Sequence, residues 1–155
     1  MIKNERQYRI TKAQAIKLEE ALERVASTSG DVALVHPRLL QAQADALRSQ
    51  LADLQTQLEA YDALRSQQQT AFSVESFEDF PRVLIQARIA AGMSQRELAE
   101  RLGLKEQQIQ RYEATEYTSA SWSRVSEVIR ALGLTVREEM VVSAPQQGVE
   151  GQSGS

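Results

Sequence analysis

Apolar residues recur at helical spacing along most of the chain, and the longest regular stretch lies between residues 38 and 69. Its apolar positions follow one another in steps of four and three: Leu40, Ala44, Leu47, Leu51, Leu54, Leu58 and Tyr61. Such steps place these side chains on one stripe of an α-helix, in the heptad pattern of coiled coils. The pattern predicts a long amphipathic helix that starts just after Pro37.

A shorter helix is predicted ahead of it, over residues 11–27. Thr11 and Gln14 have the spacing of a capping box, and Ile10 and Ala15 that of a hydrophobic staple. An apolar stripe follows, through Ala15, Leu18, Leu22 and Val25.

Two predicted helices in residues 1–70 leave two arrangements open. They can pack together as an antiparallel hairpin, the stripe of the longer helix can pair with another chain, or both can hold. We expect a dimer or partner interface at Leu47, Leu51, Leu54, Leu58 and Tyr61.

The second half of the chain has a different pattern. Residues 71–80 are predicted to be a linker because the composition shifts to Gln, Ser and acids around them. Four short helices are predicted at about 81–91, 94–102, 105–115 and 121–132, followed by a short strand at 134–142. This second domain, residues 81–142, precedes a tail, residues 143–155, that lacks core-forming residues and is expected to be disordered. The predicted fold is mainly α.

Local signals define the turn between two of these helices. Ser94 and Glu97 have capping-box spacing, and Gly103 tolerates the positive φ needed where the helix stops. Two short helices joined by so tight a turn must cross at a large angle. Ala99 is the small residue that such a crossing needs, and Ile109 is the apolar pivot of the second helix.

The spacing of Ala99, Gly103 and Ile109 resembles that of the phage-repressor type of helix-turn-helix. The segments "LIQARIAAGMSQRELAERLGL" (84–104), "KEQQIQRYEA" (105–114) and "SWSRVSEVIRALGL" (121–134) are similar to successive helices of the Xre (Cro/cI-type) transcriptional regulators. The resemblance covers about residues 80–134. It implies a C-terminal helix-turn-helix bundle whose second motif helix reads DNA.

The resemblance also implies where DNA would be contacted. Gln95 would lie against a phosphate or beside the reading helix, and the leading turns of that helix would face the major groove. Phosphates would be contacted by the loop that contains Tyr117, Ser119 and Ser121. The full set of implied DNA contacts is Gln95, Lys105, Glu106, Gln107, Gln108, Gln110, Arg111, Tyr117, Ser119 and Ser121.

Two positions depart from the family pattern. Lys105 stands where many members have Ser or Thr as the N-cap of the reading helix. The following loop, ATEYTSAS, lacks the common Gly and the basic residues that often hold phosphates.

Composition and charge exclude several kinds of function for this protein. The net charge is −3, which argues against a polycation that coats nucleic acid, although a local face can still bind DNA. No Cys is present, and the single His, His36, cannot form a usual zinc site alone. We therefore expect a cytoplasmic protein without membrane span, metal or cofactor, and not an enzyme. Trp122 is expected to anchor the core.

These features predict a homodimeric, sequence-specific repressor that reads a palindromic operator on double-stranded DNA. A small Xre-type reader joined to a helical partner module also resembles the antitoxins of toxin–antitoxin operons, which implies a toxin protein as partner. The alternative is a protein-interaction module whose hairpin binds a partner and whose helix-turn-helix does not read DNA. Residues 40–61 and the strand at 134–142 remain the two candidate dimer interfaces.

Overall fold

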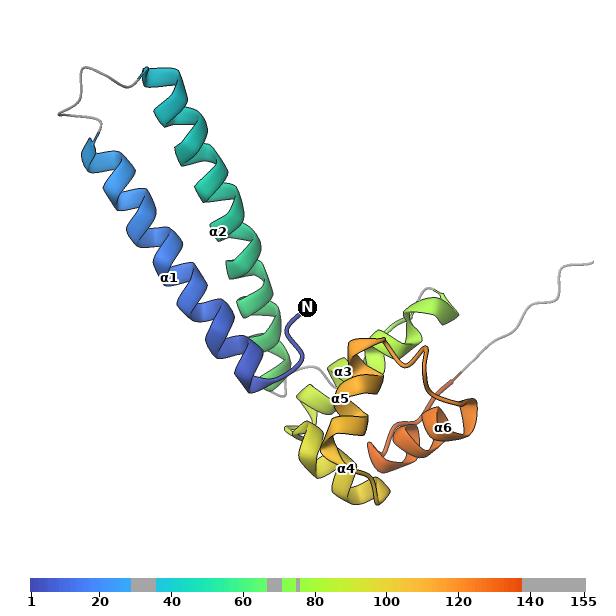
Figure 1. The fold of residues 1–155 in the computed structure, drawn as a ribbon. Helices are drawn as coiled ribbons and strands as arrows, with labels where there is room; N and C mark the ends of the chain where they lie inside the picture. The colour runs from blue at the N-terminus through green and yellow to red at the C-terminus, as the bar shows by residue number, and fades with distance from the viewer. Residues whose placement is uncertain (29–35, 67–70, 75, 138–155) are drawn as a thin grey trace, which may run out of the picture.

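The computed structural model describes residues 1–28, 36–66, 71–74 and 76–137. Over these residues the chain forms α-helices and one short 3-10 helix, and no β-strand (Figure 1). In chain order these are α1 (Glu5–Thr28), α2 (Pro37–Arg65), η1 (Phe77–Asp79), α3 (Phe80–Ala90), α4 (Gln95–Leu102), α5 (Glu106–Ala114) and α6 (Trp122–Ala131). No described helix is long and apolar enough to cross a membrane.

Helix α1 begins six residues before the predicted start, so the proposed cap at Thr11 is wrong. The cap is Asn4, whose Oδ1 accepts a hydrogen bond from the Gln7 N–H at 2.9 Å. The Gln7 side chain in turn accepts from the Lys3 N–H at 2.8 Å. Thr11 therefore lies inside the helix, and Ile10 is half exposed rather than a staple residue.

Helix α2 begins where the sequence predicts. Pro37 occupies the first turn, where its missing N–H costs no hydrogen bond. His36 is the N-cap, and its Nδ1 accepts from the Arg38 N–H at 3.3 Å. The described helix ends at Arg65, and residues 67–69 of the predicted helix lie outside the described residues.

Helices α1 and α2 run side by side in opposite directions (Figure 1). At the base of this pair, the Tyr8 hydroxyl donates to Asp62 at 2.9 Å, and Arg65 pairs with Glu5 at 2.9 Å. The rings of Tyr8 and Tyr61 are 5.2 Å apart. These contacts join the first turns of α1 to the last turns of α2.

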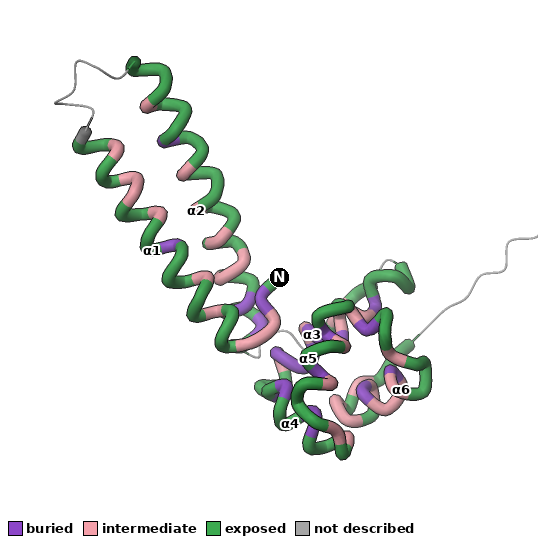
Figure 2. The backbone as a smooth tube through the Cα atoms, viewed as in Figure 1, coloured by how far each residue is buried: buried purple, intermediate pink, exposed green. Residues whose placement is uncertain are grey.

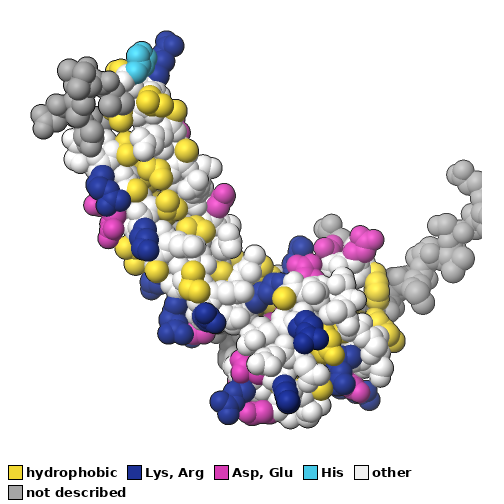
Figure 3. Space-filling model, viewed as in Figure 1, with side chains coloured by type: hydrophobic (Ala, Val, Ile, Leu, Met, Phe, Trp, Pro, Cys, Tyr) yellow, Lys and Arg dark blue, Asp and Glu magenta, His cyan; other side chains and the backbone are white. Residues whose placement is uncertain are grey.

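The leucine stripe of α2 is only partly covered in this pairing. Tyr61 is buried, whereas the other four expected interface residues are half-buried: Leu47, Leu51, Leu54 and Leu58. Apolar side chains remain visible along the pair in Figure 3.

Helices α3 to α6 form a compact lobe whose core is fully enclosed. Leu84, Ile85, Leu98, Ile109 and Val128 have no exposed surface. Each contributes about 1.5–3 kcal/mol through burial of its side chain.

The base of the α1–α2 pair joins this same core. Ile2, Tyr61 and Leu64 belong to one buried cluster with the lobe residues. In Figure 2, buried positions gather inside the lobe and where the pair meets it. The two halves of the chain therefore share one hydrophobic core.

The lobe helices have the predicted order, with bounds that differ by at most one residue. The predicted strand is not formed over residues 134–137, because Leu134 turns back and its N–H donates to the Ile129 carbonyl at 3.1 Å. The remainder of that strand and the tail, residues 138–155, lie outside the described residues.

Candidate nucleic-acid interface

The start of α4 has the predicted capping box. The Ser94 Oγ accepts from the Glu97 N–H at 3.1 Å, and the Glu97 carboxylate accepts from the Ser94 N–H at 2.7 Å. These hydrogen bonds favour the charged carboxylate and lower the pKa of Glu97.

The turn between α4 and α5 is built around Gly103, which has a φ of 65°. The Leu104 N–H reaches back to the Ala99 carbonyl at 2.8 Å, as in a Schellman motif. Ala99 is 1% exposed and Ile109 is fully buried, so the two helices meet at these side chains. The predicted helix-turn-helix geometry is confirmed at each of these positions.

Lys105 serves as the N-cap of α5 by its backbone alone. An ammonium group has no lone pair to accept a hydrogen bond from the helix N-terminus. The Gln108 Oε1 compensates because it accepts from the Lys105 N–H at 3.1 Å. Gln108 is half-buried, so this predicted base reader already has a structural partner.

The outer face of α5 carries the remaining predicted readers. Glu106, Gln107, Gln110 and Arg111 are all exposed, as is Lys105. The Gln110 amide donates to Glu106 at 3.1 Å. The side chains of Gln107 and Arg111 lie one turn apart on this face and make no hydrogen bond or ion pair to another described residue. They are therefore free to bind a ligand.

Gln95 lies beside α5 and does not face solvent. It is 5% exposed, and both ends of its amide are engaged. Its Nε2 donates to Glu113 at 2.7 Å, and its Oε1 accepts from Asn4 at 3.1 Å. Of the two roles that the family resemblance allowed, the geometry corresponds to the place beside the reading helix.

A buried ion pair that the sequence did not reveal connects α3 to α5. The Arg88 guanidinium makes two hydrogen bonds to the Glu113 carboxylate, at 2.5 and 2.8 Å. Its remaining donors reach the Met93 carbonyl at 2.7 Å and the Lys3 carbonyl at 2.6 Å. One feature of the sequence could have revealed this ion pair: Arg88 lies one turn after Leu84, on the apolar face of α3.

Tyr117 is buried, so its hydroxyl is not on the surface, where a predicted phosphate contact would need it. It is 3% exposed because Glu116 and Tyr117 both adopt positive φ, 48° and 59°, and turn the ring inward under α5. Its ring stacks on that of Tyr112 at 6.1 Å, and its N–H donates to the Tyr112 carbonyl at 2.7 Å. The hydroxyl has no hydrogen-bond partner among the described residues, and burial raises the pKa of Tyr117.

The two predicted serines of the following loop stay on the surface. The Ser119 hydroxyl is 2.9 Å from that of Thr115. Ser121 is the N-cap of α6, where its Oγ accepts from the Arg124 N–H at 3.2 Å. Both remain exposed and able to meet a phosphate.

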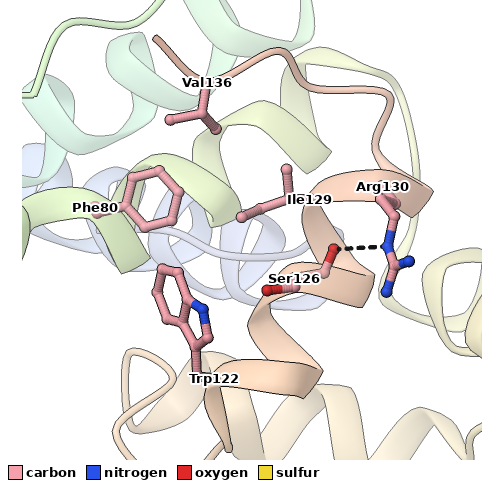
Figure 4. Close-up of a pocket in the computed structure, with 6 residues that line it drawn as sticks. All are labelled: Phe80, Trp122, Ser126, Ile129, Arg130 and Val136. Carbon is pink, nitrogen blue, oxygen red and sulfur yellow. Dashed lines mark hydrogen bonds between the residues drawn. The ribbon is translucent and has the colours of Figure 1, made fainter. Parts of the chain in front are cut away.

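Trp122 is not the core anchor that the sequence predicted. It is 59% exposed and its ring lies 5.7 Å from that of Phe77, which is 64% exposed. Figure 4 shows Trp122 at the rim of a shallow apolar hollow with Phe80, Ile129 and Val136. This hollow lies between α3 and α6, on elements other than α5.

Charge on the lobe is mixed in sign. Basic and acidic side chains alternate over its visible face in Figure 3, and one exposed pair, Arg96 with Glu100, spans 3.0 Å along α4. The described residues contain no cluster of His, Cys, Asp or Glu able to hold a metal ion. A DNA complex would therefore depend on shape and side-chain contacts more than on a basic stripe.

Comparison with known proteins finds a match in the same part of the chain. Residues 80–140 match the family model of a helix-turn-helix domain. No curated protein and no solved structure matches the chain. This segment is thus similar to a helix-turn-helix domain, which suggests a DNA-binding regulator.

Proposed function

We propose that the protein is a sequence-specific regulator that inserts α5, the reading helix, into the major groove of DNA. The observation that carries this proposal is the exposed pair Gln107 and Arg111, unpaired on one face of a helix whose opposite face is locked by Ile109. Gln bonds adenine through N6 and N7, and Arg bonds guanine through O6 and N7. The pair can therefore discriminate between base pairs.

One helix of nine residues offers few base contacts, so the proposal includes a homodimer. Two reading helices about 34 Å apart would face successive major grooves and read a palindromic site. Dimerisation also compensates for the mixed charge of the lobe.

The α1–α2 pair is the proposed surface for the second copy or for a toxin protein. It projects from the lobe, and its leucine stripe, Leu47 to Leu58, is half-buried within the single chain (Figure 1). A DNA reader joined to such a module fits a repressor that is also the antitoxin of its operon, in the cytoplasm.

The test is selection of DNA duplexes from a random pool by the full-length protein. We expect one enriched palindromic sequence. The Gln107→Ala/Arg111→Ala double variant should lose at least about 30-fold in its preference for that sequence, since each of the two bidentate contacts contributes about 1–3 kcal/mol. Arg137→Ala is the control for the loss of an arginine, because Arg137 is exposed and lies outside both α5 and the α1–α2 pair. Selection of the same sequence by the Gln107/Arg111 variant would overturn the assignment of α5.

The second candidate is a protein-interaction module that does not read DNA. It is favoured by the alternating charge of the lobe and the net charge of −3. Such a protein would enrich no sequence, and its weak binding to DNA would not depend on Gln107 or Arg111. The same selection therefore separates the two candidates.

A further inference from the structure

Residues 2–4 leave the base of α1 and enter the helix-turn-helix lobe. Ile2 is 3% exposed and belongs to the lobe's buried cluster. The next two residues bond to three different helices. The Lys3 carbonyl accepts from Arg88 of α3 at 2.6 Å, and the Asn4 amide donates to Gln95 of α4 at 3.1 Å. The third bond, to α5, comes from the Lys3 ammonium.

That ammonium lies at the C-terminal end of the reading helix. The Lys3 Nζ donates to the Glu113 carbonyl at 2.6 Å, in the last turn of α5. That carbonyl also accepts from the Glu116 N–H at 3.2 Å. The helix dipole makes this end of α5 negative, so a cation is stabilising here. Glu113 follows Arg111, the proposed guanine reader, by two residues. Lys3 thus bonds the backbone next to that reader.

Asn4 has a second role in the same segment. Its Oδ1 caps α1, and its Nδ2 holds Gln95, which in turn bonds the Glu113 carboxylate. The start of α1 is therefore linked through one side chain to the buried network beneath α5.

We propose that residues 2–4 are a clasp that positions the reading helix, with Lys3 as its positioning residue. The clasp makes the α1–α2 pair and the lobe one body, so DNA reading depends on residues outside the helix-turn-helix domain. Its role in reading rests on the proposed function, whereas its hold on α5 does not.

The test compares Lys3→Met with Lys17→Met in the full chain. Both remove one positive charge, and Lys17 is exposed on α1. Hydrogen exchange is measured first, without DNA. We expect amides of the last turns of α5 to exchange roughly tenfold faster in Lys3→Met, because a hydrogen bond to a charged group is lost, and those of α6 to be unchanged. Lys17→Met should match the original protein.

Binding to the selected duplex is measured next, over a range of salt concentrations. We expect Lys3→Met to weaken binding roughly tenfold with an unchanged salt slope, because the ammonium contacts protein and not phosphate. Lys3→Arg, which keeps a donor cation, should restore most of the affinity. A slope reduced by about one would identify a phosphate contact and overturn the positioning role.

Two further outcomes would overturn the proposal. Equal exchange in Lys3→Met and Lys17→Met would mean that the segment does not hold α5. Faster exchange with unchanged affinity would mean that the hold does not matter for reading. If the original protein selects no sequence, the proposed function fails, and the exchange comparison still decides whether residues 2–4 clasp the helix.

Discussion

Glu113 in α5 and Arg88 in α3 form a bidentate ion pair, at 2.5 and 2.8 Å, in which both side chains are almost completely buried. Every nitrogen of the guanidinium has a hydrogen-bond acceptor, and Glu113 has a further donor in Gln95. Buried charges need hydrogen-bond partners of this kind, because the effective dielectric constant of the protein interior is low. The pair ties α5 to α3.

Replacement of Arg88 by Met should therefore destabilise the protein strongly. The substitution leaves the Glu113 carboxylate buried without its cation, and we expect a loss of about 3–5 kcal/mol in the free energy of unfolding. Urea denaturation monitored by circular dichroism measures it. The double variant Arg88→Met/Glu113→Met, which removes both charges, should recover part of that loss. A single variant within about 1 kcal/mol of the original protein would contradict the importance of the pair.

Substitution of two neighbouring glutamines of α5 should change different properties of the protein: its stability for Gln108 and its base preference for Gln107. Gln108→Ala removes the side chain that accepts from the Lys105 N–H, and should lower the free energy of unfolding by about 0.5–1.5 kcal/mol. Gln107 is exposed and unpaired, so Gln107→Ala should change it by less than about 0.5 kcal/mol. The preference for particular bases should be lost in Gln107→Ala and kept in Gln108→Ala. Urea denaturation and competition between duplexes provide the two measurements, and equal loss of base preference in both would assign reading to Gln108 as well.

Tyr117→Phe should leave DNA binding unchanged. The Tyr117 hydroxyl is buried and has no partner among the described residues, so its removal relieves a desolvation cost. We expect the free energy of unfolding to stay the same or rise by about 1 kcal/mol. Ser119→Ala is the comparison for binding, because that hydroxyl is exposed in the same loop. Weaker DNA binding by Tyr117→Phe would show that the hydroxyl reaches a phosphate after all.

Glu116→Gly should stabilise the fold. Glu116 has a φ of 48°, a left-handed conformation that costs a residue with a Cβ about 1–2 kcal/mol and costs glycine little. The extra flexibility of glycine in the unfolded chain offsets part of the gain, so we expect a net rise of about 0.5–1 kcal/mol. Glu100→Gly, in the exposed interior of α4, should instead destabilise by about 1 kcal/mol. Thermal unfolding compares the two variants, and a loss of stability in Glu116→Gly would refute strain at this turn.

The absence of the common glycine in this loop was visible in the sequence, but its consequence was not. The chain reverses here through Glu116 and Tyr117, both at positive φ, and this brings the Tyr117 ring into the core. A sequence pattern gives no sign that two residues with side chains adopt this conformation.

By itself, the sequence determined the helix-turn-helix. Ser94, Glu97 and Gly103 act through hydrogen bonds and backbone angles within a few residues, so their spacing specifies the helix start and the turn. The heptad stripe likewise specified α2. The match of residues 80–140 to a helix-turn-helix family model agrees with that reading of the pattern.

Only the tertiary structure decided which of the predicted DNA-contacting side chains are exposed. Glu113 meets Arg88 across 25 residues and Lys3 across 110, and the availability of a side chain depends on such distant partners. Gln95 is buried in this way between Asn4 and Glu113, and Lys3 lies against the C-terminal end of α5. Local pattern places a residue on a helix, whereas burial and long-range partners determine whether its polar atoms remain free.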